Sequence, residues 1–190
     1  MPLRIRVRSR GSGPTRRPPP GERPGSFIVD PGRATPPLPV YVLRSVLESM
    51  HRYARSGGEF EVGGFLLGGY HYHEGHSYLD ITAEVPCLKA RSARTHLTFS
   101  NEAQREFHRV AQERHPDKRV LGWYHTHPGY GVFLSDYDLF VQRSFFAEEH
   151  LVAVVIDPLE PPSQRTGVFV WHRGDVSHGY HLIVYDQEVP

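Results

Sequence analysis

The chain contains very little cysteine and lysine. Cys87 is the single cysteine among 190 residues, so an intramolecular disulfide and a zinc site built from several thiolates are both excluded. We expect Cys87 to be a buried apolar residue rather than a nucleophile. Only Lys89 and Lys118 accompany 20 arginines. This imbalance reflects either a general bias toward arginine or avoidance of lysine-directed conjugation.

Long hydrophobic runs are also missing. The longest run, residues 151–156, is far shorter than the roughly 20 residues that a membrane-spanning helix requires. The N-terminus is rich in arginine and proline and lacks the apolar core of a secretory signal. We therefore expect a cytoplasmic protein without a membrane partner.

The charges are nearly balanced overall but unevenly distributed. Residues 1–25 hold seven arginines and one acidic residue, which leaves 15 basic and 20 acidic residues in the remainder, a net charge of −5. Nucleic-acid binding usually requires a basic face, so we expect no nucleic-acid partner for the folded part. The basic N-terminal stretch is either solvated chain or an arm for an acidic partner.

The composition divides the chain in two. Residues 1–37 are rich in arginine, proline and glycine, which predicts a mostly irregular tail. Within it, residues 3–8 (LRIRVR) alternate in polarity, and this leaves open a strand at a sheet edge. Residues 38–190 should form one ordered domain, and we expect a chain starting at residue 37 to fold.

Hydrophobic periodicity predicts the elements of that domain. A helical stripe runs through residues 43–54 and ends at two glycines, a second helix ends at Pro116, and residues 135–149 form a third. In the third helix, the pattern places Tyr137, Phe140, Val141, Ser144 and Phe145 on one side. Strands are expected at 61–72, 77–88, 95–100, 119–127, 150–158, 166–173 and 179–186, with a hairpin at 73–77. This order predicts an α/β fold in which about three helices pack on a mixed, largely antiparallel central sheet.

One segment carries the strongest chemical signal. Residues 121–140 read LGWYHTHPGYGVFLSDYDLF. Alternate side chains of a strand share a face, so His125 and His127 could bind one metal ion together. After the turn, Ser135 is a candidate helix N-cap, and Asp138 in the first helical turn is a candidate third ligand. The simpler alternative is a pair of surface histidines followed by an ordinary capped helix.

A hydrolytic metal site also needs a base, and Glu61 is the candidate. It precedes a glycine-rich strand, and Gly63 and Gly64 would allow close approach to a neighbouring strand. A second histidine group, His71, His73 and His76, is either another metal site or an exposed hairpin.

Together these residues resemble the JAMM (MPN-plus) metalloprotease family. Its pattern is a distant glutamate followed by His-Ser/Thr-His-Pro, six residues and Ser-x-x-Asp, which is matched here by Glu61 and HTHPGYGVFLSDYD. The stretches GWYHTHPGYGVFLS, EVGGFLLG and VAVVIDP are similar to the catalytic core of proteasome-lid and signalosome deubiquitinating subunits. The resemblance covers about residues 40 to 175 and implies a JAB/MPN-like fold with layering like that of cytidine deaminases.

The resemblance implies a zinc-dependent isopeptidase or peptidase. His125, His127 and Asp138 would bind one zinc ion per chain, Glu61 would activate a water molecule, and Ser135 would hold the oxyanion. The bond cut would follow the C-terminal glycine of a ubiquitin-like protein. Partners would be that modifier or its conjugates, with activating and conjugating enzymes of the same pathway.

Two alternatives accompany this interpretation. The domain could be a non-catalytic MPN scaffold that docks a partner, or a narrow protease that processes a sulfur-carrier protein. Larger relatives carry long insertions around the site, whereas the stretch after Asp157 is short here. A compact, prokaryotic-type catalytic core is therefore expected.

Overall fold

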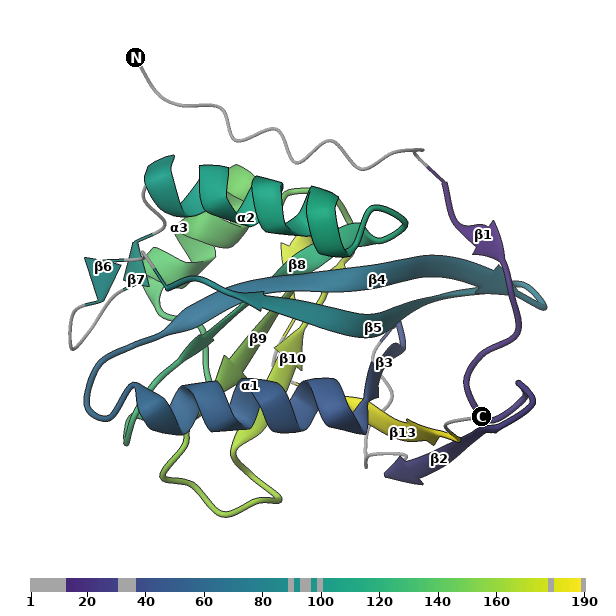
Figure 1. Cartoon of the computed structure of the whole chain (residues 1–190), viewed down its shortest axis with the longest axis horizontal. Helices are drawn as coiled ribbons and strands as arrows, with labels where there is room; N and C mark the ends of the chain where they lie inside the picture. The colour runs from purple at the N-terminus through teal and green to yellow at the C-terminus, as the bar shows by residue number, and fades with distance from the viewer. Residues whose placement is uncertain are drawn as a thin grey trace.

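Three helices lie on the two faces of one central sheet (Figure 1). The computed structural model describes residues 13–30, 37–88, 91–92, 97–98, 101–177 and 180–188. Helix α1 (Arg44–Ser56) covers one face, and helices α2 (Asn101–Arg114) and α3 (Asp136–Phe145) cover the other. Among the described helices, none has both the length and the apolar character needed to cross a bilayer.

The sheet is mixed, as predicted. Its order is β10 (Thr166–Phe169), β9 (Val152–Ile156), β8 (Arg119–Thr126), β4 (Gly63–His73), β5 (His76–Pro86), β3 (Val40–Leu43), β13 (Ile183–Gln187) and β2 (Ser26–Asp30), while β1 (Thr15–Arg16) pairs with β4. The longest pairings, β4 with β5 and β4 with β8, are antiparallel, whereas β8 and β9 run parallel. Two small ribbons lie apart: β6 (Arg91–Ser92) with β7 (Leu97–Thr98), and β11 (Trp171–His172) with β12 (Asp175–Val176).

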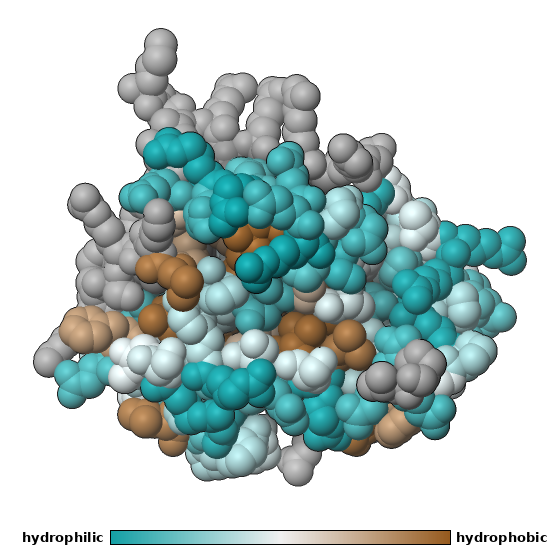
Figure 2. Space-filling model, in the orientation of Figure 1, coloured by the Kyte–Doolittle hydropathy of each residue, from teal (hydrophilic) through white to brown (hydrophobic). Residues whose placement is uncertain are grey.

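Two hydrophobic cores form because helices cover both faces of the central strands. The core under α1 includes Met50, Leu66 and Tyr124, and the core under α2 and α3 includes Phe107, Trp123 and Val141. All five residues of β9 are buried, which explains its continuous apolar run. On the outer surface, Figure 2 shows mostly hydrophilic side chains with small hydrophobic patches between them.

Two glycines let β4 and β8 approach their neighbours closely. A Cβ at Gly64 would collide with the Val85 carbonyl and lie 2.8 Å from the Tyr124 ring. At Gly122, φ is +144°, and a Cβ would meet the Val152 carbonyl. A side chain at either position would push apart the strands that carry the candidate site.

The N-terminal stretch contributes two strands that its composition did not predict. β2 pairs with β13, and β1 pairs with β4. Between them, the Arg23 side chain bonds the Asp80 carboxylate at 2.7 Å, where both side chains are largely buried. The strands form because the domain offers two unpaired edges and a buried carboxylate, none of which is visible in a tail's composition. Residues 3–8 lie outside the described part, and the predicted domain division remains a prediction.

One side of α3 is exposed and the other is buried against the sheet. Tyr137 and Phe140 are 40% and 58% exposed, whereas Asp138, Val141 and Gln142 are buried. The ring centroids of Tyr137 and Phe140 are 6.4 Å apart on the exposed side, whereas Val141, which was predicted on the same side, is buried. The N-terminal cap fixes where the helix begins and turns Asp138 toward β8, so a partly polar face packs on the sheet.

Candidate metal centre

The two histidines lie at the C-terminal end of β8, on the face covered by α3. Strand alternation brings them to the same side, and their Nε2 atoms are 3.1 Å apart. Both side chains are almost completely buried. The His127 amide donates to the Ile156 carbonyl at 2.9 Å, which fixes the chain where β8 ends. This burial excludes the alternative of two surface histidines.

Asp138 reaches the histidines from α3. Ser135 is the N-cap, its hydroxyl accepts from the Asp138 amide, and the Ser135 amide and hydroxyl both donate to Asp138 Oδ2 at 2.8 and 2.6 Å. Asp138 Oδ1 is 3.3 Å from His125 Nε2, and Oδ2 is 3.3 Å from His127 Nε2. The capping box predicted from sequence therefore orients the candidate ligand.

These three side chains fit a zinc ion. Their donor atoms lie within 4.8 Å of one another. Two nitrogens on one tetrahedral zinc ion would lie about 3.3 Å apart, close to the observed Nε2 separation. Burial lowers the pKa of His125, which favours the neutral imidazole that a metal requires. Burial would raise the pKa of Asp138, but the hydrogen bonds and charge of His125, with bonds from His127 and Ser135, hold it well below its usual range.

Glu61 joins this group from a distant part of the sequence. The Val62 amide donates to Thr126 Oγ1 and the Thr126 amide donates to the Val62 carbonyl, both at 2.9 Å. These bonds place Glu61 beside the end of β8, with Oε1 4.0 Å from His127 Nε2. Burial raises the pKa of Glu61 to about 7, opposed by His127 and assisted by Asp138. A carboxyl group with a pKa near neutrality suits proton transfer.

The turn after His127 is held by a residue that the sequence analysis did not assign to the site. Asp157 is fully buried and accepts backbone hydrogen bonds from Gly129, Gly131 and Leu159, each 2.8 or 2.9 Å long. Although burial alone would raise its pKa, these three bonds lower it. An aspartate directly after a buried strand was the available signal, but the partner amides lie 26 and 28 residues away.

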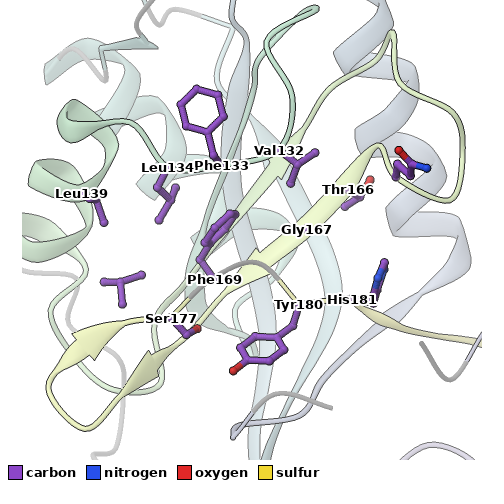
Figure 3. Close-up of a pocket in the computed structure, with 12 residues that line it drawn as sticks. Val132, Phe133, Leu134, Leu139, Thr166, Gly167, Phe169, Ser177, Tyr180 and His181 are labelled. Atoms are coloured by element: carbon purple, nitrogen blue, oxygen red, sulfur yellow. The ribbon is translucent and has the colours of Figure 1, made fainter. Parts of the chain in front are cut away.

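A pocket opens beyond the ring of Phe133, beside this centre. The Phe133 and His127 ring centroids are 4.8 Å apart. The pocket has a volume of about 560 Å³ and lies between the 132–134 segment, β10 and Tyr180 (Figure 3). Phe133 therefore contacts a candidate ligand and also lines a partly apolar cavity.

The second histidine group has other contacts. His71 Nδ1 is 2.7 Å from Thr15 Oγ1, and His73 Nε2 is 3.1 Å from Glu22. Both partners belong to the N-terminal stretch beside β4. Within the described part of the chain, the His125, His127 and Asp138 group is the one that could hold a metal ion. The alternative of a second histidine metal site is not supported there.

Comparison with known proteins identifies the family. The model of JAB, the JAB1/Mov34/MPN/PAD-1 ubiquitin protease family, matches residues 37–149. The chain belongs to the JAB family. It is 37% identical over 122 residues to COP9 signalosome complex subunit 5 of Neurospora crassa, and 30% identical over 133 residues to ubiquitin carboxyl-terminal hydrolase RPN11 of Saccharomyces cerevisiae.

These JAB-family relatives are longer proteins. The two matches cover 61% and 70% of this chain but 34% and 42% of the relatives. The solution structure of protein DSY2949 from Desulfitobacterium hafniense is also similar, with a TM-score of 0.59, 20% identity and coverage of 78% of this chain and 94% of that one. At this identity the likeness concerns the fold, which agrees with the predicted α/β class.

Proposed function

We propose that the chain is a zinc-dependent isopeptidase or peptidase that cleaves after the C-terminal glycine of a ubiquitin-like protein. One observation carries the proposal: two imidazoles and a carboxylate converge, and a second carboxyl group with a raised pKa lies 4.0 Å from His127. Three protein ligands are typical of catalytic zinc sites, whereas structural zinc sites usually have four. Glu61 adds a buried carboxyl group beside the ligands, and metal-dependent hydrolysis requires such a group to accept a proton from water.

His125, His127 and Asp138 would hold one zinc ion per chain. Zinc bound to three protein ligands supplies a Lewis acid that polarises a carbonyl group and lowers the pKa of water. The chain's own contribution is a dry and rigid surrounding, since all three ligand side chains are buried. Ser135 keeps the Asp138 carboxylate oriented by two hydrogen bonds to Oδ2.

Glu61 would act as general base and then as general acid. As a carboxylate, it would take a proton from the attacking water molecule, which adds to the carbonyl carbon. The same proton would pass to the leaving amine as the C–N bond breaks. Burial raises the pKa of Glu61 toward neutrality, which suits a group that first takes up a proton and then returns it.

Ser135 would stabilise the oxyanion of the tetrahedral intermediate. Its hydroxyl donates to Asp138 Oδ2, and its backbone amide donates to the same oxygen. The hydroxyl proton can therefore turn toward the substrate while the amide still holds the carboxylate. Such a donor typically contributes about 100- to 1,000-fold to the rate.

The proposed substrate class is a ubiquitin-like modifier, as a conjugate or as a precursor. Family membership supports it, and so does the relative whose name describes a ubiquitin carboxyl-terminal hydrolase. Activating and conjugating enzymes of the same pathway are the proposed further partners. We propose the cytoplasm as the place of action.

The test compares Glu61→Gln with Glu59→Gln. The purified chain should contain about one zinc ion, and Glu61→Gln should retain it while cleavage of a ubiquitin-like protein carrying a fluorogenic amine falls at least about 100-fold. The Glu59→Gln control changes the same residue type two positions away and should remain active. Full activity of Glu61→Gln would refute the assigned base.

A binding module would give a different pattern. It would retain the zinc ion and the fold but would cleave neither modifier fusions nor conjugates, with or without Glu61. His125→Ala should remove most of the zinc, and retention of a full equivalent would refute the ligand assignment.

A further inference from the structure

The candidate metal ligands belong to two separate elements, and a second pair of residues repeats their arrangement. Trp123 precedes His125 by two positions on β8, so both side chains face α3. Gln142 follows Asp138 by four positions on α3, so both face β8. The Trp123–Gln142 pair therefore lies next to the His125–Asp138 pair along β8 and α3.

Gln142 is fully buried, and its amide group joins three parts of the fold. Trp123 Nε1 donates to Gln142 Oε1 at 2.7 Å. Gln142 Nε2 donates to the Leu151 carbonyl at 2.8 Å and to the Phe146 carbonyl at 3.2 Å. Because an indole can only donate and a carbonyl can only accept, one orientation of the amide satisfies all three bonds. The bonds fix α3 to β8 and to the residue that precedes β9.

Trp123 also determines the plane of a candidate ligand. The Trp123 and His125 rings are stacked with centroids 4.5 Å apart and planes at 13°. Metal-binding histidines usually donate their second ring nitrogen to an acceptor that orients the ring. Here His125 Nδ1 is buried and has no hydrogen-bond partner among the described residues. The stacked indole restrains the plane of the His125 ring by contact and not by a hydrogen bond.

We propose that Trp123 and Gln142 are positioning residues of the metal centre. They hold the His125 ring in its plane and set the register of α3 along β8, which brings Asp138 to the histidines. The inference rests on the proposed function only as far as that function places a metal ion on these ligands.

The hydrogen bonds of Gln142 can fix the register of α3 because hydrogen bonds are directional. Apolar contacts such as that of Val141 keep the helix against the sheet, but they tolerate sliding because they are non-directional. Hydrogen bonds weaken steeply with misalignment, so the buried amide resists such sliding. Metal sites require ligands placed within about 0.5 Å. A loose α3 would therefore weaken metal binding before it unfolded the protein.

The test measures zinc affinity of the full chain by competition with a chromogenic chelator. Trp123→Phe retains an aromatic ring beside His125 but removes the N–H, and Gln142→Met removes all three bonds at similar volume. Each should weaken zinc binding at least about tenfold, the lower range for residues that support metal ligands. The visible absorption of the cobalt-substituted protein should change as well, because it reports ligand geometry.

Trp171→Phe is the matched control. Trp171 Nε1 donates to the Phe146 carbonyl at 2.9 Å, the same carbonyl that Gln142 contacts at the end of α3. This variant loses the same kind of bond and should lower the melting temperature, yet zinc affinity and the cobalt spectrum should stay unchanged. Equal weakening by Trp171→Phe would show that general stability is responsible and would overturn the proposal.

A double variant provides the second criterion. If the two residues act as one unit, Trp123→Phe combined with Gln142→Met should lose no more zinc affinity than the weaker-binding single variant. Additive losses of zinc affinity would refute the idea that Trp123 and Gln142 act together. If Gln142→Met fails to fold, Trp123→Phe decides alone, and wild-type affinity there overturns the proposal.

The outcomes also separate this inference from the proposed reaction. A wild-type protein that binds zinc but cleaves no modifier fusion would refute the reaction and leave the affinity results valid. A wild-type protein that binds no zinc would overturn both.

Discussion

Replacing Arg23 by methionine removes the cation from a largely buried ion pair. The Arg23 and Asp80 side chains are 10% and 1% exposed, and their charged atoms are 2.7 Å apart. After the change, Asp80 would retain the Tyr185 hydroxyl bond at 2.7 Å but no positive partner. Leaving one charge of a buried pair uncompensated costs about 3–5 kcal/mol. We expect the free energy of unfolding to fall by about that amount.

Urea denaturation followed by circular dichroism measures this loss. In a chain of this size, about 3–5 kcal/mol corresponds to a melting temperature lower by roughly 6–20 °C. Arg44→Met is the control, because Arg44 pairs with Asp186 at 3.1 Å where the side chains are 42% and 34% exposed. Exposed pairs contribute about 0–1 kcal/mol. A loss from Arg23→Met no larger than that from Arg44→Met would refute the reasoning.

A double variant identifies the cause. Asp80→Asn removes the buried charge while its amide oxygen can still accept from Tyr185, so Arg23→Met with Asp80→Asn should recover most of the lost stability. No recovery would mean that the other contacts of Arg23 matter more, namely those to Tyr78 and the Pro18 carbonyl. A chain that starts at residue 37 lacks Arg23, β1 and β2 together. Contrary to the expectation from composition, it should be destabilised at least as much.

Three further predictions follow from single contacts. Asp157→Asn should destabilise the chain at neutral pH. Because the pKa of Asp157 is lowered in the folded state, the carboxylate's contribution to stability is present above the unfolded pKa of about 3.9 and is lost in acid. The unfolding curves of the variant and the wild type should therefore converge as pH falls. Convergence at high pH instead would contradict this sign. Thr126→Val removes the hydroxyl that accepts from the Val62 amide and should lower kcat without loss of zinc. Thr126→Ser retains the hydroxyl and should keep the wild-type rate. Equal rates for the valine and serine variants would show that this hydrogen bond is dispensable. Cys87→Ser should leave cleavage intact, and a chelator should abolish it. The reverse result would indicate thiol chemistry.

The candidate ligand set could be proposed from the sequence because each part depends on local geometry. Strand alternation puts His125 and His127 on one face whatever the strand packs against. A Ser-x-x-Asp cap likewise turns Asp138 toward its own helix terminus. The hairpin of β4 and β5 and the end of α1 before Gly57 follow similarly from local patterns. These features need only the residues within one or two turns.

The remaining features depended on contacts between distant segments. Glu61 was proposed from the sequence, but the β4–β8 register is what brings it within 4.0 Å of His127. The inward face of α3, the strands near the N-terminus and the bond between Trp123 and Gln142 had no local signal that specified them. Each exists because a buried donor, acceptor or strand edge must find a partner, and the partner is chosen by packing in three dimensions. Periodicity within one segment reports which face is apolar, but it does not report what a polar group on that face will meet.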